Sequence, residues 1–417
     1  MPTLEDYRDL VGADTVEELH LLGRRLEGKS VLNVNATAVG GGVAEILSRM
    51  VPLLRQLGVD ARWEVIKGGE DFHAATKRFH NALHGAAATV TPRDYEVYEV
   101  TLQENLAALS LEAGIVFIHD PQPAGLVRER KALGNKWIWR CHIDLSRPDP
   151  EVWEFFRAYV KQYDACVFSA PSFARSLEVP QMLIAPSIDP LSDKNRELTP
   201  EETGAILERL RIPTDKPIVT QVSRFDRLKD PAGVIEAFRM ANASASARLL
   251  LVGGPADDDP EGAQVLAEVQ ERTKGDEDIL VLCLPPTSHL EINAIQRAST
   301  IILQKSLREG FGLTVTEALW KGKPVIAGAV GGLPLQISHK CSGVLTHSIE
   351  GTAYWLRHLL NEPAYAAWLG ANGREGVRQH FLLTRQLRDY LLLFAFLESG
   401  ERDFIHLAGE AVHKGTR

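Results

Sequence analysis

Short runs of apolar residues alternate with amphipathic stretches along the first half of the chain. Leu19, Leu22 and Leu26 recur at helical spacing and predict a helical leader, and a second helix is expected over 43–57. Strands are predicted for six apolar runs: 31–34, 63–66, 115–118, 137–141, 165–168 and 183–185. Strands that alternate with helices in this way form a parallel sheet covered on both faces.

A polar stretch at 187–195 interrupts this alternation, which then starts again. Further strands are predicted at 218–222, 249–252, 279–283, 301–303 and 324–327. We therefore expect an α/β fold with two doubly wound, Rossmann-like domains facing a central cleft. The domains are expected to span 1–190, including the leader, and 191–380, with a C-terminal helix and tail at 381–417 that crosses back to the first domain. Ligands of such sheets bind beyond the carboxyl ends of the strands, so the expected site lies in the cleft.

The composition is that of an ordinary globular protein. The 417 residues are 45% apolar and 24% charged, which is enough for two hydrophobic cores. The net charge of -9 argues against nucleic acid or an anionic membrane as the main partner, although a local basic pair can still hold a phosphate. We therefore expect small-molecule partners.

The cysteines and the ends of the chain indicate a soluble, cytoplasmic protein. The four cysteines include no Cys-x-x-Cys pair, which is typical of reduced, buried thiols. The first ten residues are polar and acidic, unlike a secretory signal. The most apolar short run, Tyr390–Leu397, is too short to span a bilayer.

The segment 309–317 carries the strongest chemical signal. Gly310 and Gly312 follow a predicted strand and open a helix, so their backbone N–H groups can approach an anion closely. The helix N-terminus also favours a phosphate. Glu309 is expected in the loop facing the cleft, and Glu317, two turns later, suits a pair of ribose hydroxyls. The alternative is an ordinary turn with two solvated glutamates.

A basic pair follows the first predicted strand of the second domain. Arg224 and Lys229 lie in a loop from which both side chains can reach a ligand above the sheet edge. A departing diphosphate needs such cations when no metal is present, because arginine offers a planar fork and lysine a mobile point charge. The alternative is a solvated basic loop.

Ionisable residues also end two strands of the first domain. Asp120 follows the strand at 115–118, while His142 and Asp144 follow the strand at 137–141. Such residues at strand ends are expected for a site, and they can bind sugar hydroxyls. For His119, which precedes Asp120, or for His142 alone, a purely structural role is the alternative.

Three other features are interpreted without a cofactor or metal. The loop at 40–42 resembles a dinucleotide fingerprint only weakly, since Glu45 stands where a third glycine is needed. The acidic run 257–259 is interpreted as a solvated loop. His80 and His84 have helical spacing, but no third zinc ligand is evident.

Together these motifs resemble a known family. Segment 309–317 resembles the E-x7-E signature of retaining glycosyltransferases with the GT-B fold, and Arg224 with Lys229 resembles their diphosphate-binding pair. The stretches VNATAVGGGVAEIL, HDPQPAGL, WRCHIDLS and REGFGLTVTEALWKGKPVIAGAVGG are similar to the glycosyl-transferring trehalose synthases. The resemblance runs from about Leu4 to Tyr390, and the HDPQP and CHIDLS segments are also similar to trehalose phosphorylases.

The resemblance implies a role for each matching position. The second domain would bind the nucleotide sugar, and the first the acceptor. Donor binding would fall to Gly41, Gly42, Arg224, Lys229, Glu309, Gly310, Phe311, Gly312, Leu313 and Glu317. Acceptor binding would fall to Asp120, His142 and Asp144, and catalysis to Glu309, Arg224, Lys229, His142 and Asp120. Asp230 departs from the pattern, since many relatives carry glycine there.

The resemblance also implies an activity. The chain would make trehalose reversibly and with retention from ADP-, UDP- or GDP-glucose and free glucose, as a homodimer with neither cofactor nor metal. The preferred base stays open. The alternatives are a trehalose phosphorylase, another nucleotide-sugar transferase or an epimerase on the same fold, and a non-catalytic sensor of nucleotide sugars.

Overall fold

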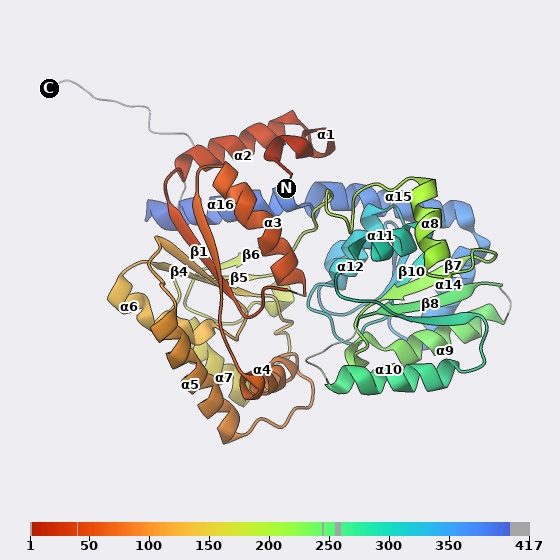
Figure 1. Ribbon diagram of the computed structural model, residues 1–417, viewed down its shortest axis with the longest axis horizontal. Helices are drawn as coiled ribbons and strands as arrows, with labels where there is room; N and C mark the ends of the chain where they lie inside the picture. The colour runs from red at the N-terminus through yellow and green to blue at the C-terminus, as the bar shows by residue number, and fades with distance from the viewer. Residues whose placement is uncertain (1, 40, 244–245, 255–259, 401–417) are drawn as a thin grey trace. The chain divides into compact units, whose positions relative to one another are not determined.

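The computed structural model describes residues 2–39, 41–243, 246–254 and 260–400. The acidic run 257–259 and most of the C-terminal tail lie outside these ranges. The chain forms two compact units, one of Met1–Ala185 with Leu383–Arg417 and one of Pro186–Leu382 (Figure 1). The predicted domain limits at 190 and 380 differ from these by a few residues.

The first unit is built on a six-stranded parallel sheet in the order β2-β1-β3-β4-β5-β6. Its strands are β1 (Ser30–Asn35), β2 (Asp60–Val65), β3 (Ile115–His119), β4 (Lys136–Cys141), β5 (Ala165–Phe168) and β6 (Gln181–Leu183). The expected strand at 183–185 was placed two residues late, because Gln181 and Met182 already pair with β5.

The second unit contains another parallel sheet of six strands, in the order β12-β11-β10-β7-β8-β9. Its strands are β7 (Ile218–Val222), β8 (Arg248–Gly253), β9 (Ile279–Cys283), β10 (Ile301–Gln304), β11 (Val325–Gly328) and β12 (Val344–Thr346). The short edge strand β12 was not predicted. The strands β7 and β10 are neighbours, so the loops after them leave the sheet at the same edge.

Helices flank both sheets (Figure 1). The first unit has α1 (Arg8–Val11), α2 (Ala13–Arg25), α3 (Gly42–Gln56), α4 (Glu70–Leu83), α5 (Pro92–Ala108), α6 (Arg130–Leu133), α7 (Pro150–Val160) and α16 (Leu383–Ser399), with 3-10 turns η1 (Leu4–Tyr7), η2 (Ala124–Glu129) and η3 (Pro171–Phe173). The second has α8 (Pro200–Arg209), η4 (Arg227–Lys229), α9 (Pro231–Asn242), α10 (Pro260–Thr273), α11 (His289–Ala298), α12 (Leu313–Trp320), α13 (Leu333–Gln336), α14 (Ile349–Asn361) and α15 (Pro363–His380).

The C-terminal helix expected within 381–417 corresponds to α16, and a separate helix, α15, precedes it. Helix α15 ends at His380 and α16 begins at Leu383, with Phe381 and Leu382 between them. The backbone of Phe381 accepts a hydrogen bond from Ile188 N instead of continuing the helix. Helix α16 belongs to the first unit and packs against α2.

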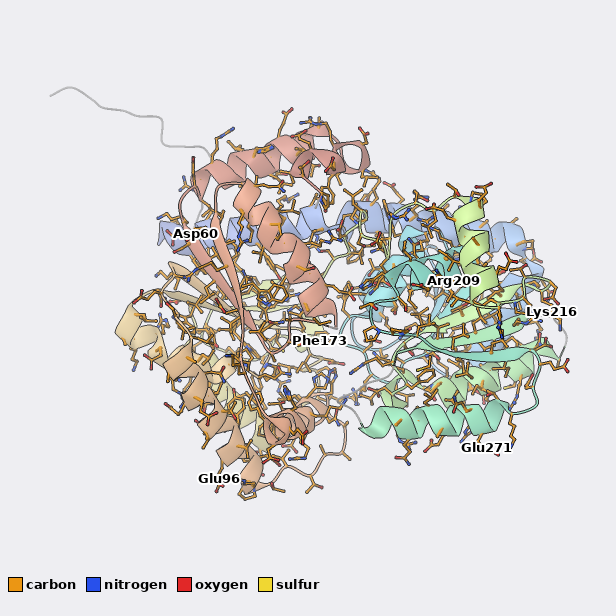
Figure 2. The ribbon with its side chains drawn as sticks, in the orientation of Figure 1. Asp60, Glu96, Phe173, Arg209, Lys216 and Glu271 are labelled. Carbon is orange, nitrogen blue, oxygen red and sulfur yellow. The ribbon has the colours of Figure 1, made fainter. Side chains whose placement is uncertain are left out.

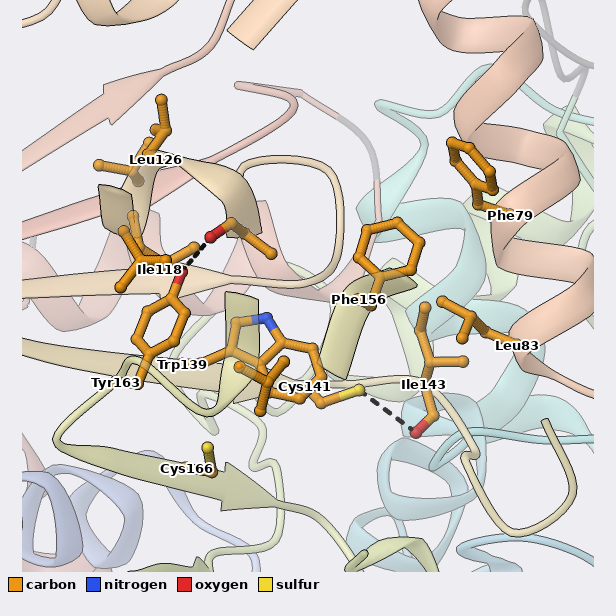
Figure 3. Packing of buried hydrophobic residues seen from close by; sticks show 14 of the residues in the cluster. Phe79, Leu83, Ile118, Leu126, Trp139, Cys141, Ile143, Phe156, Tyr163 and Cys166 are labelled. Carbon is orange, nitrogen blue, oxygen red and sulfur yellow. Dashed lines mark hydrogen bonds between the residues drawn. The ribbon is translucent and has the colours of Figure 1, made fainter. Parts of the chain in front are cut away.

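Aromatic and aliphatic side chains fill the first unit's core between the sheet and helices α4, α5 and α7. Trp139, Phe156 and Cys166 are among its buried members (Figure 3). Glu96, Arg209 and Glu271, in contrast, are exposed (labelled in Figure 2). This is the usual segregation of apolar and charged side chains.

The cysteines only partly follow the prediction. All four are free, and Cys141 and Cys166 are buried, where loss of solvation raises the pKa of both thiols. Cys283 and Cys341 are exposed, contrary to the expectation of four buried thiols. Among the described residues, no helix combines the length and apolarity needed to cross a membrane.

Candidate active site

In the second unit, two adjacent strand ends bring Lys229 and Glu309 into contact. The loops after β7 and β10 are joined by a hydrogen bond from Leu307 N to Leu228 O of 2.7 Å. Lys229 Nζ donates to Glu309 Oε2 at 2.6 Å, and the side chains are 18% and 8% exposed. The two motifs that were predicted separately therefore form one ion pair.

Glu309 is held as an anion in a buried position. Its Oε2 also accepts hydrogen bonds from Gln304 Nε2 at 3.2 Å and from Ser306 Oγ at 3.0 Å. Burial raises the pKa of Glu309, but the charge of Lys229 and these hydrogen bonds outweigh it, and the net pKa is lowered. The carboxylate is therefore charged at neutral pH.

The loop after Glu309 runs through Gly310 and Phe311 into α12, and close packing holds it in place. Gly312 has φ of 81° and caps α12, and a Cβ there would lie 2.9 Å from Leu333 Cδ2. A Cβ on Gly331 would come within 1.7 Å of Glu309 O. The first N–H groups of a helix such as α12, which begins at Leu313, lack acceptors within the helix and can bind an anion.

Glu317 lies inside α12 with one oxygen unused. The residue is 2% exposed, and Oε1 lies 3.6 Å from Lys194 Nζ. Within the described part of the chain, Glu317 Oε2 is buried and has no hydrogen-bond partner. Such atoms are rare in native structures and are commonly satisfied by a water, ion or ligand.

Arg224 is less constrained than Lys229. Its side chain is 54% exposed, and Nη2 lies 3.7 Å from Asp226 Oδ2, beyond hydrogen-bond distance. An exposed guanidinium without a short partner can reorient toward a ligand.

Asp230, which departs from the family pattern, adopts the backbone conformation that glycine favours. Its φ and ψ are 50° and 51°, a left-handed geometry. Its carboxylate accepts from Gly233 N at 3.0 Å, which caps α9, and forms an ion pair with Lys305. The loop therefore keeps the conformation expected of glycine, and the aspartate adds contacts.

In the first unit, Asp120 and His142 meet at the ends of β3 and β4. His142 N donates to Asp120 Oδ1 at 2.8 Å, and Asp120 N donates to Arg140 O at 2.8 Å. Asp120 has φ of 68°, uncommon for a residue other than glycine. Burial raises the pKa of Asp120 to about 7, although the His142 amide and the charge of Arg140 oppose it.

A second histidine, His119, contacts the ring of His142. Its Nδ1 lies 3.3 Å from His142 Nε2, and its Nε2 lies 3.1 Å from Asn33 Oδ1. Burial, with the nearby charge of Arg140, lowers the pKa of His119 to about 3 and that of His142 well below its usual value. Both rings are therefore neutral at physiological pH.

The remaining predicted residues are less closely connected. Asp144 is buried, and its Oδ1 accepts from Ser146 N at 2.8 Å within its own turn. Gly41 has φ of 83° and precedes α3, which begins at Gly42. Between these three residues and Asp120 or His142, the described chain has no hydrogen bond.

The sequence argument missed several residues that support these groups. They are Asn33, Gln304, Ser306, Lys305, Gly331, Gly332 and Gln336. Polar Asn33 and Gln304 stand out within apolar strands, and this signal could have been used. Over the residues described, no group of three or more histidine, cysteine or acidic side chains is arranged to hold a metal ion.

Two family models match the chain. "Trehalose synthase, N-terminal domain" matches residues 33–175, and "Glycosyl transferases group 1" matches residues 203–376. The trehalose synthase of Rubrobacter xylanophilus is 44% identical over 404 residues, covering 94% of this chain and 97% of that protein. A trehalose phosphorylase of Pleurotus pulmonarius is 30% identical over 397 residues, covering 82% of this chain and 54% of that protein.

A solved structure supports the architecture. The sucrose-phosphate synthase of Thermosynechococcus elongatus superposes with a TM-score of 0.71 at 20% identity, covering 89% of this chain and 100% of that one. Together with the two parallel sheets, this likeness confirms the predicted GT-B fold class.

Proposed function

Because this chain belongs to the trehalose synthase family of glycosyltransferases, we propose that it makes trehalose from a nucleoside-diphosphate-glucose and free glucose. The transfer is reversible and retains the configuration at the anomeric carbon. The substrates are ADP-, UDP- or GDP-glucose, glucose and trehalose. The homodimer implied by the resemblance is part of this proposal and is tested by measuring the mass in solution.

The observation that most favours a nucleotide sugar as the donor is the buried Glu317 Oε2, which has no hydrogen-bond partner among the described residues. A carboxylate oxygen can only accept hydrogen bonds, and ribose hydroxyls can donate them. Inorganic phosphate at neutral pH is an anion, and the negative charge of the Glu317 carboxylate would repel it. Glu317 therefore favours a nucleotide-sugar transferase over a phosphorylase.

The cations of the second unit suit a departing diphosphate. As the bond from the sugar C1 to the phosphate oxygen breaks, negative charge grows on the β-phosphate. Lys229 is fixed by Glu309, Arg224 is free to reorient, and the amides of 310–313 are held by packing. Preorganised groups of this kind lower the barrier because they need little rearrangement during the reaction.

The acceptor's proton completes the step. The acceptor hydroxyl oxygen bonds to C1 on the face from which the diphosphate leaves, and its proton passes to the departing phosphate oxygen. This order gives retention. Asp120 and His142 are assigned to hydroxyl groups of the sugars, and Glu309 to the donor sugar beside Lys229.

Product analysis of two incubations, together with a binding measurement, compares the main alternatives. The enzyme is incubated with trehalose and either ADP, UDP, GDP or inorganic phosphate, and the products are identified. A sugar nucleotide and glucose are expected with a nucleoside diphosphate. Glucose 1-phosphate formed only with phosphate would establish the phosphorylase. In the second incubation a sugar nucleotide is supplied without acceptor, and its conversion to another sugar nucleotide would establish an epimerase. Binding without any turnover would indicate a sensor.

A further inference from the structure

Three polar side chains form a hydrogen-bonded row across the sheet of the first unit. Asn33 lies in β1, His119 ends β3, and His142 follows β4, and these strands are neighbours. Asn33 Oδ1 lies 3.1 Å from His119 Nε2, and His119 Nδ1 lies 3.3 Å from His142 Nε2. Asn33 and His119 are each 2% exposed, and neither has a part in the mechanism above.

The amide of Asn33 sets the order of the hydrogens in this row. Its Nδ2 donates to Arg62 O at 3.4 Å, which turns Oδ1 toward His119. An amide oxygen only accepts, so His119 Nε2 carries the hydrogen. A neutral imidazole carries one hydrogen, so His119 Nδ1 is an acceptor and His142 Nε2 is the donor to it.

The surroundings keep both imidazoles neutral, as this order requires. Arg140 is fully buried on β4, and its Nη2 donates to Ser169 Oγ at 3.2 Å. The burial of the rings, together with the positive charge of Arg140, disfavours a second proton on either histidine. The stacked rings, with centroids 5.6 Å apart, complete the arrangement.

We propose that Asn33 and His119 are positioning residues that hold His142 in the Nε2–H tautomer, so that Nδ1 accepts a hydrogen bond from a sugar hydroxyl. Apart from His119, the ring of His142 has no hydrogen-bond partner among the residues described. An acceptor nitrogen recognises a hydroxyl and rejects a group that cannot donate. The identification of the ligand as a sugar rests on the proposed function, whereas the tautomer does not.

Nitrogen NMR of the enzyme labelled with 15N-histidine tests the tautomer directly. Signals are assigned by their loss in His119→Gln and His142→Gln. In the wild type, protonated Nε2 and unprotonated Nδ1 are expected for both rings. A protonated Nδ1 on His142 would overturn the proposal, whatever the enzyme's activity.

Two leucine variants separate the row from general effects of burial. Asn33→Leu removes the acceptor and should give His142 a mixture of tautomers. Asn35→Leu is the matched control, since Asn35 is also buried in β1 but bonds to Trp63 and Thr37, and it should keep the wild-type tautomer. An unchanged tautomer in Asn33→Leu would refute the role of Asn33.

Kinetics and ligand analogues extend the test to recognition. Because only the Nε2–H tautomer of His142 can accept the sugar hydroxyl, kcat/KM of Asn33→Leu should fall in proportion to the remaining fraction of that tautomer, with nucleoside diphosphate affinity unchanged. Each hydroxyl of glucose is replaced in turn by fluorine or by hydrogen. At the position that Nδ1 recognises, the fluoro and deoxy analogues should both bind more weakly than glucose and to a similar extent, because fluorine cannot donate a hydrogen bond. If all fluoro analogues bind like glucose, Nδ1 accepts no sugar hydroxyl. If no trehalose forms but the tautomer is as stated, only the proposed function fails.

Discussion

Lys229 Nζ and Glu309 Oε2 are 2.6 Å apart, joining the two conspicuous motifs of the second unit. The lysine comes from the loop after β7 and the glutamate from the loop after β10. Because the pair is largely buried, each charge depends on the other for stabilisation. The pair therefore links the stability of the unit to the geometry proposed for the donor site.

Removing both members of this pair should cost less than the two single removals added together. Lys229→Met leaves a buried carboxylate without its cation and should reduce the free energy of unfolding by about 3 kcal/mol. In the double variant Lys229→Met/Glu309→Gln, the loss should be smaller than the sum of the single losses by about 1–3 kcal/mol. Urea unfolding of the four proteins measures this coupling, and strictly additive losses would contradict it.

Arg224→Ala should affect the reaction and leave stability almost unchanged. The side chain is 54% exposed and has no short ion pair, so its loss removes little from the folded state. If it stabilises the departing diphosphate, kcat/KM should fall by a factor of about 100–1000. Arg239→Ala, at an exposed ion pair with Asp276, is the control and should retain activity. A folded Arg224→Ala enzyme within about threefold of wild type would exclude the proposed role.

Glu317→Gln tests whether the unpartnered oxygen binds ribose. The substitution keeps the shape but replaces a charged acceptor, so nucleoside diphosphate affinity should fall about 10–100-fold. Pyrophosphate has no ribose, and its affinity should change little. Calorimetric titration of both ligands gives the comparison. An equal loss for pyrophosphate would assign Glu317 a general electrostatic role.

The sequence predicted the fold class well because the evidence for it is local. Alternating apolar runs and helices were sufficient to predict two parallel sheets, which the structure confirms. The strand β12 was missed because three residues at a sheet edge carry too little pattern. Site residues were proposed from the loops after strands, where phosphate-binding motifs are recognisable.

Most contacts of those residues could not be predicted, because they depend on how the loops fold and pack. Ser306 and Gln304 contact Glu309 only because the loop folds back on its own strand. Gly331 approaches Glu309 O from the loop after β11. Asp230 looked like a departure from the family, and only its dihedral angles reveal that it occupies the glycine conformation. Such contacts depend on tertiary packing.

The stability of variants at Asp230 should depend both on the loss of the α9 cap and on the strain of the left-handed backbone. Asp230→Gly removes the cap and the Lys305 ion pair but relieves the left-handed strain, whereas Asp230→Ala removes both contacts and keeps the strain. We expect alanine to be less stable than glycine by about 1 kcal/mol, with asparagine between glycine and wild type. Thermal unfolding measures the order, and alanine equal to glycine would show that the φ of 50° is unstrained.

Asp120 should make the stability of the first unit fall as pH rises. Its pKa is raised to about 7, mainly by burial, whereas an unfolded aspartate titrates near 3.9. Between about pH 4 and 7 the folded protein therefore binds a proton that the unfolded chain does not. Its contribution is lost as the pH rises through this range and is constant above it. The loss would reach at most about 4 kcal/mol.

Asp120→Asn isolates this effect, because asparagine tolerates a φ of 68° and its Oδ1 can still accept from His142 N. The variant does not titrate, so its unfolding temperature relative to wild type should rise from pH 5 to about pH 7 and then level off. Thermal unfolding of both proteins from pH 5 to 9 measures this difference. If this difference in unfolding temperature stayed constant or grew toward low pH, the folded Asp120 would be ionised over the whole range. That result would contradict the raised pKa of Asp120.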